Sequence, residues 1–206
     1  MTFQIQETSP RPRARMTGVL YLLYFLTAIL GQQMVSRGFA VSGNATNIIS
    51  TLLYVVVTLL FYGLFKPVSK IVSLLTALVS LAGCVFMSLG LIHINSPISP
   101  LLFFAPFCLL IGYLILKSSF LPRALGVLMV FAGVGWLAYL IQAVPHILSL
   151  AIMVLGFLAE LSLCLWLLVM GVNVERWKLQ ASTTNASIEF REAPSTVQRV
   201  SRTAQR

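Results

Sequence analysis

Glu160 is the residue of this chain whose type and position most clearly suggest chemistry. It lies about midway along a long apolar run and is the only acidic residue inside any such run. A carboxyl group at the centre of a bilayer costs on the order of a few kcal/mol, so its side chain should face other helices rather than lipid. Because the only Lys and Arg residues within the runs, Lys70 and Arg123, lie at run ends and not near the middle, we expect a neutral carboxylic acid, hydrogen-bonded to a Tyr, Ser or Thr hydroxyl. Tyr54 is a candidate donor at similar depth.

Polar side chains follow a helical spacing on the first two apolar runs, at steps of three or four residues. Such stripes occur where helices pack closely, and they occur where helices line a cavity. Glu160 likewise has two interpretations, as polar glue between helices or as a proton carrier or anchor for a cationic ligand. The stripes are Thr17, Tyr21, Tyr24, Ala28 and Gln32, then Asn47, Thr51, Tyr54, Thr58 and Tyr62. The candidate ligand- or proton-binding residues are Glu160, Tyr54, Tyr21, Tyr24 and Thr58.

The other residue types argue against several kinds of chemistry. The chain has no Asp, which removes aspartyl proteolysis and the Asp-held Mg²⁺ sites of phosphoryl transfer. No nucleotide-binding pattern occurs. His93 and His146 are weak metal candidates, since two imidazoles without an acidic or thiol partner make a poor site. We therefore nominate no catalytic residue, expect no cofactor, and regard an enzyme as the less favoured class.

The composition indicates the elements that must hold these residues in place. The chain has 206 residues, of which 58% are hydrophobic and 9% charged, and its mean hydropathy is +0.93. Too few charges are available to cover a soluble globule of this length. Runs of about 18 or more apolar residues can cross a bilayer as helices. Six such runs predict an all-α bundle of six transmembrane helices, at about Met16–Val35, Asn47–Phe65, Val68–Ile92, Ile98–Leu116, Pro122–Ala143 and Ile147–Val172.

Basic residues are distributed very unevenly between the two sides of these runs. Thirteen of the 14 Lys and Arg residues fall on one side, and only Arg37 falls on the other. Such residues stay on the cytoplasmic side of a membrane, so both termini are predicted to be cytoplasmic. The same placement explains the net charge of +9 through contact with lipid head groups. The predicted anchors are Arg13, Arg15, Lys66, Lys70, Lys117, Arg123, Arg176 and Lys178.

Three parts of the chain can be distinguished. A basic cytoplasmic arm covers residues 1–15, the six-helix domain covers residues 16–172, and a cytoplasmic tail covers residues 173–206. The tail is polar from about Ala181 on, so we expect it to be largely disordered. One alternative is that the first run is a signal peptide cleaved near Ala40, although its length and its tyrosines argue against cleavage.

Three stretches of sequence carry a family resemblance. They read RMTGVLYLL at 15–23, GYLI at 112–115 running into SFLPRALGVL at 119–128, and ELSLCLWLLVMGVN at 160–173. Together they resemble a bacterial membrane family called domain of unknown function 4386, over roughly residues 10–178. The resemblance implies a multi-helix protein of a bacterial inner membrane and implies no activity or substrate. Met170 stands where the family pattern has a basic residue.

The sequence favours a multi-pass membrane protein that binds or passes a small solute or lipid through a polar cavity centred on Glu160. The alternative is a sensor or assembly subunit that packs against a membrane partner through small-residue helix faces. The expected partners are the lipid bilayer, a small-molecule or lipid ligand, and a membrane-protein partner or second copy of the chain. Nucleic acid is not expected. The chemical identity of the ligand does not follow from the sequence.

Overall fold

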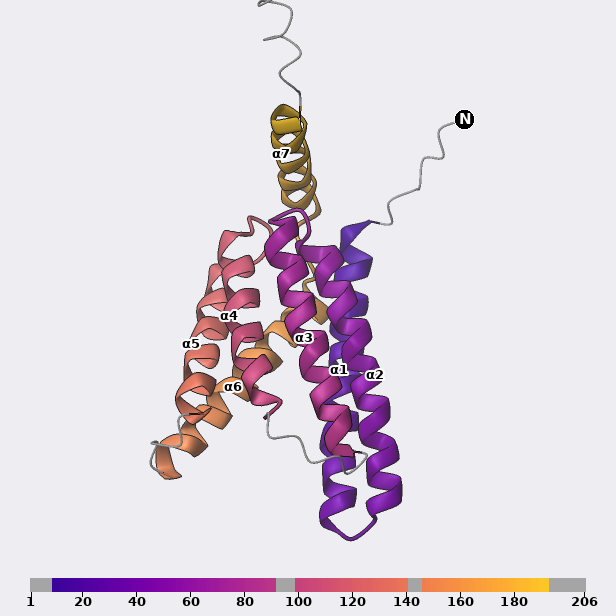
Figure 1. Ribbon diagram of the computed structural model, residues 1–206. Helices are drawn as coiled ribbons and strands as arrows, with labels where there is room; N and C mark the ends of the chain where they lie inside the picture. The colour runs from indigo at the N-terminus through magenta and orange to yellow at the C-terminus, as the bar shows by residue number, and fades with distance from the viewer. Residues whose placement is uncertain (1–8, 92–98, 141–145, 193–206) are drawn as a thin grey trace, which may run out of the picture.

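The computed structural model describes residues 9–91, 99–140 and 146–192, and within these ranges the chain forms seven α-helices and no strand (Figure 1). An apolar segment in hydrocarbon has no water to pair with its backbone N–H and C=O groups, and a helix pairs them internally. The helices are α1 (Pro10–Ser36), α2 (Ala40–Phe65), α3 (Lys70–Leu91), α4 (Leu101–Lys117), α5 (Arg123–Leu140), α6 (His146–Val169) and α7 (Val174–Glu192).

Five of these helices, α1, α2, α3, α5 and α6, are long and apolar enough to cross a membrane. Helix α4 is apolar but has only 17 residues, about 25 Å at 1.5 Å per residue. The fourth run was predicted from Ile98, whereas α4 begins at Leu101, directly after Pro100. Proline disfavours a helical conformation in the residue before it, which accounts for the late start.

Large apolar side chains are exposed on the outer faces of the bundle. Leu26 of α1 is 56% exposed and Phe131 of α5 is 61% exposed, and Ile49, Leu78 and Leu158 show the same on other helices. In water, apolar surface spread over every helix would drive association or aggregation. In hydrocarbon the same side chains meet a solvent of their own polarity, so this surface fits contact with lipid.

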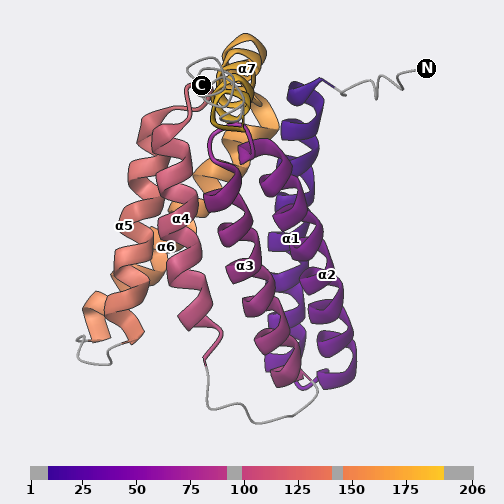
Figure 2. The ribbon, with the colours of Figure 1, turned by 45° about the horizontal axis from the view of Figure 1, so that its top comes forward.

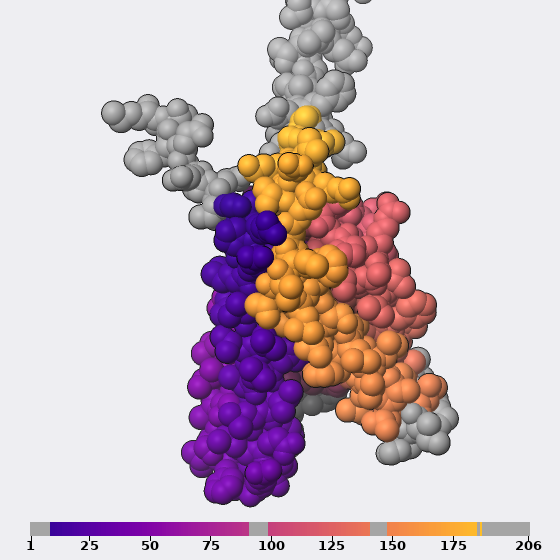
Figure 3. Space-filling model, turned by 180° about the vertical axis from the view of Figure 1, so that it is seen from behind, coloured from indigo at the N-terminus to yellow at the C-terminus, as the bar shows by residue number. Residues whose placement is uncertain are grey.

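The six helices α1–α6 form a closed ring. Each packs against the next along the chain, and α6 returns to pack against α1. Figure 1 shows α6 inclined behind the other helices, and Figure 2 shows the same arrangement from another direction. From behind, α6 lies against α1 toward the end that carries α7 and diverges from it toward the other end (Figure 3).

Helices α4 and α5 approach each other so closely that no side chain fits between them. A Cβ atom built on Gly112 would lie 2.9 Å from the backbone nitrogen of Val130, and one built on Gly126 would lie 2.9 Å from the carbonyl oxygen of Gly112. Gly31 and Gly43 bring α1 and α2 together in the same way. Close backbone approach through small residues is how helices gain packing energy where lipid competes for apolar contact.

The turn between α1 and α2 depends on one glycine. Gly38 has a φ of +89°, a conformation that L side chains rarely adopt. Its N–H donates to the carbonyl of Val35 at 3.0 Å, and the N–H of Phe39 donates to the carbonyl of Met34 at 2.9 Å. These two bonds form a Schellman motif, which ends α1 and lets α2 begin at Ala40.

Helix α7 is a difference from the sequence prediction. The tail was expected to be largely disordered from about Ala181, but α7 continues through this point to Glu192. Residues 193–206 lie outside the described part of the chain. The helix starts because the side-chain oxygen of Asn173 accepts a hydrogen bond from the backbone N–H of Arg176 at 3.1 Å, which caps its first turn.

Tertiary contacts then hold α7 against the bundle. The indole N–H of Trp177 donates to the carbonyl of Leu64 at the end of α2 at 3.0 Å. The hydroxyl of Thr184 donates to the carbonyl of Pro67 at 2.7 Å. Polar composition alone predicts no helix here, because these partners lie more than 100 residues earlier in the chain.

The predicted basic anchors gather at one end of the bundle. The start of α1, the α2–α3 turn, the α4–α5 turn and α7 all lie at this end, and the α1–α2 turn with Arg37 lies at the other (Figure 1). The guanidinium of Arg15 donates to the carbonyl of Val169 at 3.2 Å, and that of Arg176 donates to the carbonyl of Ser119 at 3.4 Å. This end carries Arg13, Arg15, Lys66, Lys70, Lys117, Arg123, Arg176 and Lys178.

Adding one methyl group at Gly112 is expected to destabilise the bundle. The new Cβ would overlap the backbone of α5, so Gly112→Ala should lower the free energy of unfolding by about 1–3 kcal/mol. Gly63→Ala is the control, because a Cβ there meets nothing within 4 Å. Denaturation of both purified variants in the same detergent measures the difference. Equal stability of the two variants would show that the α4–α5 contact is not close.

Candidate functional site

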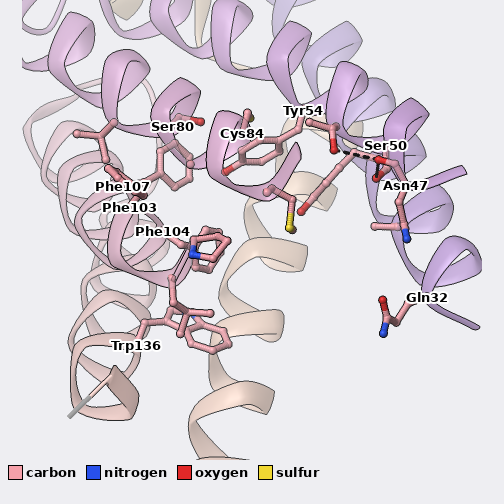
Figure 4. Close-up of a pocket in the computed structure, with 18 residues that line it drawn as sticks. Gln32, Asn47, Ser50, Tyr54, Ser80, Cys84, Phe103, Phe104, Phe107 and Trp136 are labelled. Carbon is pink, nitrogen blue, oxygen red and sulfur yellow. Dashed lines mark hydrogen bonds between the residues drawn. The ribbon is translucent and has the colours of Figure 1, made fainter. Parts of the chain in front are cut away.

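A cavity of about 400 Å³ lies between α1, α2, α3 and α4, with one residue of α5 completing its lining (Figure 4). Its size is typical of sites for small molecules. The cavity runs from the middle of the bundle toward the end opposite the basic residues, where Gln32 and Asn47 line it. No lining residue within the described ranges carries a formal charge.

One wall of the cavity is polar and comes from α1 and α2. It contains three residues of each stripe that the spacing identified, with Ser50 in addition, whereas Thr17, Tyr21, Thr58 and Tyr62 do not line the cavity. A helix presents residues three and four apart on one face, so the two stripes meet where α1 and α2 face the centre of the ring. The wall consists of Tyr24, Ala28, Gln32, Asn47, Ser50, Thr51 and Tyr54.

The opposite wall is aromatic and comes from α4 and α5. Its rings form an unbroken belt with the tyrosines of the polar wall, in the order Tyr24, Tyr54, Phe107, Phe104 and Trp136. The successive ring centroids are 4.7, 6.1, 6.2 and 5.6 Å apart. These spacings are favourable for aromatic pairs. Phe103 also lines this wall, and it stacks on Phe86 of α3.

Helix α3 supplies the third wall, through Ser80, Gly83 and Cys84. The hydroxyl of Ser80 is 2.7 Å from that of Thr58, and either can donate. Thr58 was a candidate binding residue. The structure buries it to 2% exposure and pairs it with α3, so it supports the wall rather than lining the cavity.

The hydroxyl group of Tyr54 is the one tyrosine hydroxyl of the lining that is both buried and without a hydrogen-bond partner in the described part of the chain. The side chain itself is only 9% exposed. A buried hydroxyl without a partner costs roughly 1–3 kcal/mol, and buried polar groups without protein partners usually meet water or a ligand. In Figure 4, Tyr54 lies across the cavity beside Cys84. Tyr54 therefore contributes to the lining a side chain whose hydroxyl has an unused hydrogen bond.

Glu160 lies in α6 and is buried, with 4% exposure. The hydroxyl of Tyr21 in α1 donates to its Oε2 atom at 2.8 Å. Tyr21 is itself completely buried. This bond joins two residues 139 positions apart and links α1 to α6, the first and last helices of the ring. Among the described residues, the carboxyl group has no other polar partner.

The donor to Glu160 is Tyr21 and not Tyr54, which had been put forward as a candidate from its depth. The reason is the order of the helices, because α6 packs against α1 and α5 rather than against α2. Gly18 of α1 sits directly on the backbone of Leu168 in α6. Tyr21, one turn along α1, then faces Glu160. Depth along the membrane was a sound guide, but adjacency of helices decides the partner.

Glu160 does not line the cavity, although the cavity was expected to be centred on it. Two lining residues instead contact its partner. The ring centroid of Tyr21 is 6.0 Å from that of Tyr24 and 6.4 Å from that of Tyr54. The carboxyl group is thus one aromatic side chain away from the cavity, and Tyr21 connects the two.

The structure does not describe the side chains of the two histidines that were weak metal candidates. His93 lies outside the described residues, and the side chain of His146 does too. Within the described ranges no three or more His, Cys, Asp or Glu residues gather in a geometry suited to a metal ion. Reasoning from the sequence missed the aromatic wall, because Phe103, Phe104 and Trp136 follow no pattern that separates cavity-lining rings from lipid-facing ones.

The helices, the exposed apolar surface and the buried carboxyl group together define an all-α membrane protein with several membrane-crossing helices. Residues 98–171 match the family model described as Domain of unknown function (DUF4386). This match confirms the resemblance given by the second and third motifs, and it covers α4, α5 and α6. Comparison with curated proteins and with solved structures finds no significant match.

Removing the hydroxyl of Tyr21 is expected to cost more than changing Glu160. In Tyr21→Phe the buried carboxyl group loses its donor, so the free energy of unfolding should fall by about 1–3 kcal/mol. Glu160→Gln keeps an oxygen that can accept the same hydrogen bond, so the free energy of unfolding of this variant should fall by less than about 1 kcal/mol. Both values come from denaturation in detergent.

The control for this comparison is Tyr113→Phe, since Tyr113 is 45% exposed on α4. It removes the same atom from a solvated or lipid-facing site and should change stability little. If Tyr21→Phe proves no more destabilising than Tyr113→Phe, the hydrogen bond to Glu160 does not hold α1 against α6.

Proposed function

We propose that this chain is a multi-pass protein with six membrane spans. It binds a small solute or lipid in the cavity between α1, α2, α3 and α4, or passes this molecule through the membrane. Both termini and α7 are then cytoplasmic. On the family resemblance, the membrane is a bacterial inner membrane. The observation that carries the proposal is the cavity whose lining includes Tyr54, a residue with a buried, unpartnered hydroxyl.

The position of α4 supports its assignment as a sixth span. It lies in the ring between α3 and α5. The turns before α3 and after α4 are at the same end of the bundle, so the chain must cross twice between Lys70 and Lys117. A helix of about 25 Å can be accommodated when Lys117 extends its ammonium group to the interface and the bilayer thins slightly.

The alternative function, a sensor or assembly subunit, relies on small-residue faces that are free to meet a partner. In this chain most of those faces are used internally, because a Cβ added to the glycines would strike a neighbouring helix. This holds for Gly18, Gly31, Gly43, Gly112, Gly126, Gly133 and Gly156. Binding of a ligand within the bundle is therefore the better supported function.

The proposed orientation predicts which exposed positions a membrane-impermeant maleimide can reach. Val41 at the start of α2 is 88% exposed and Leu179 in α7 is 66% exposed, and they lie at opposite ends. In intact cells Val41→Cys should be labelled and Leu179→Cys should not. After permeabilisation both should react. The native cysteines are buried, so the unsubstituted chain gives the baseline. Labelling of Leu179→Cys in intact cells would reverse the orientation.

A reachable cavity predicts selective modification of Cys84, which lines it. Methyl methanethiosulfonate, a small neutral reagent, should modify Cys84 at least about tenfold faster than Cys108 and Cys164, since access governs thiol reaction rates among buried cysteines. The latter two are 0% exposed and serve as controls within the same molecule. Peptide mass spectrometry of the purified protein gives the three rates.

Filling the cavity should abolish this selectivity. Ala28→Phe places a ring among the lining residues and should slow the modification of Cys84 toward the rates of Cys108 and Cys164. Gly63→Phe adds the same ring where a Cβ meets nothing within 4 Å and should leave the rate unchanged. Equal rates for the three cysteines of the unsubstituted chain would contradict a cavity that takes a solute.

A further inference from the structure

The cavity combines several features that favour one class of ligand. No Lys, Arg or His side chain of the described residues lines it, so no cationic side chain there attracts an anion, although the buried indole N–H of Trp136 has no partner among the described residues and can donate to a ligand oxygen. The carboxyl group of Glu160 is separated from the cavity by the single ring of Tyr21. Glu160 is also the only acidic residue in α1–α6. The charges around the cavity therefore favour a positively charged ligand over a negatively charged one.

The aromatic belt adds an attraction of the same sign. Five rings follow one another around the cavity, from Tyr24 of α1 to Trp136 of α5. The face of each ring carries partial negative charge, which attracts a cation within about 6 Å of the ring centre, and more strongly where water is excluded. Trp and Tyr are the better ring types for this contact, and three of the five rings are of these types.

The free hydroxyl of Tyr54 supplies a directional contact. It is buried, it has no partner among the described residues, and it belongs to the second ring of the belt, between Tyr24 and Phe107. As an acceptor it can take a hydrogen bond from an ammonium or hydroxyl group, and as a donor it can give one to a ligand oxygen. A ligand with a cationic body and a small polar group would satisfy both the belt and this hydroxyl.

We infer that the ligand of the cavity is a small organic cation of the alkylammonium class, held by the aromatic belt; a nearby positive charge favours the ionised form of a carboxyl group, so on binding Glu160 releases its proton and becomes the counter-charge behind Tyr21. The inference rests on the proposed function, since it names the class of solute that the cavity takes. It adds a requirement that the proposed function does not make, namely that positive charge is preferred over a neutral body of the same shape.

Three probes of nearly one shape test this preference. Choline carries a trimethylammonium group, 3,3-dimethylbutan-1-ol replaces that group by a neutral tert-butyl group, and 3,3-dimethylbutanoate carries a negative charge on a tert-butyl body. Each is added to the purified full chain in an uncharged detergent at constant ionic strength. Protection of Cys84 from methyl methanethiosulfonate reports occupancy, because Cys84 lines the cavity. The half-protecting concentration of choline should be about tenfold lower than that of the neutral alcohol, and the anion should protect least.

Variants identify the groups responsible. Phe104→Leu removes a ring of the belt and Glu160→Gln removes the counter-charge, and each should reduce the ratio of the half-protecting concentrations of the alcohol and choline to a few-fold. Phe131→Leu is the matched control, because Phe131 is 61% exposed on the outer face of α5, and it should retain the full advantage. Size-exclusion profiles and unfolding temperatures show that each variant is folded before it is compared.

The outcomes separate this inference from the proposed function. If the alcohol protects Cys84 as well as choline does, or if no probe protects a Cys84 that reacts readily, the cation preference is overturned while the reachable cavity stands. If Cys84 is unreactive without any probe, the proposed function fails and the inference fails with it. An advantage of choline that survives both Phe104→Leu and Glu160→Gln also overturns the assignment.

Discussion

The hydrogen bond between Tyr21 and Glu160 is the contact on which the arrangement of the bundle depends. A carboxyl group cannot face lipid without a cost of several kcal/mol, so the helix that carries Glu160 must turn it toward the protein. The donor is on the first helix of the chain, which means that α6 has to return to α1 and close the ring. Helices α2–α5 are then confined between these two, in the order in which they follow along the chain.

The contact between α1 and α6, which closes the ring, is tighter at one end of the bundle than at the other. At the basic end, Gly18 lets α1 rest on the backbone of Leu168, and Trp177 ties α7 to α2. Toward the opposite end α6 diverges from α1 (Figure 3). The cavity lies toward this end, where polar side chains of α1 and α2 and aromatic side chains of α4 and α5 line it. The hydrogen bond from Tyr21 to Glu160 lies behind the rings of Tyr24 and Tyr54, which line the cavity.

The sequence predicted the parts of this structure that follow from transfer energies along the chain. The positions of the long apolar helices, the clustering of basic residues and the burial of Glu160 all depend on local composition. It did not predict the partner of Glu160, because Tyr21 and Tyr54 occupy equivalent stripe positions and only the packing of α1 on α6 separates them. Helix α7 was missed for a related reason, since the acceptors of Trp177 and Thr184 come from distant turns.

The chemistry of the two walls implies an orientation for whatever enters the cavity. Amide and hydroxyl groups are concentrated on α1 and α2, around Gln32 and Asn47, whereas the rings of Phe104 and Trp136 face them from α4 and α5. A ligand with one polar end and one bulky end would pair the polar end with the first wall and the bulky end with the second. Tyr54 belongs to both walls and contacts Tyr21. A molecule that binds the hydroxyl of Tyr54 would therefore contact a ring that packs against Tyr21, and Tyr21 donates the hydrogen bond to Glu160.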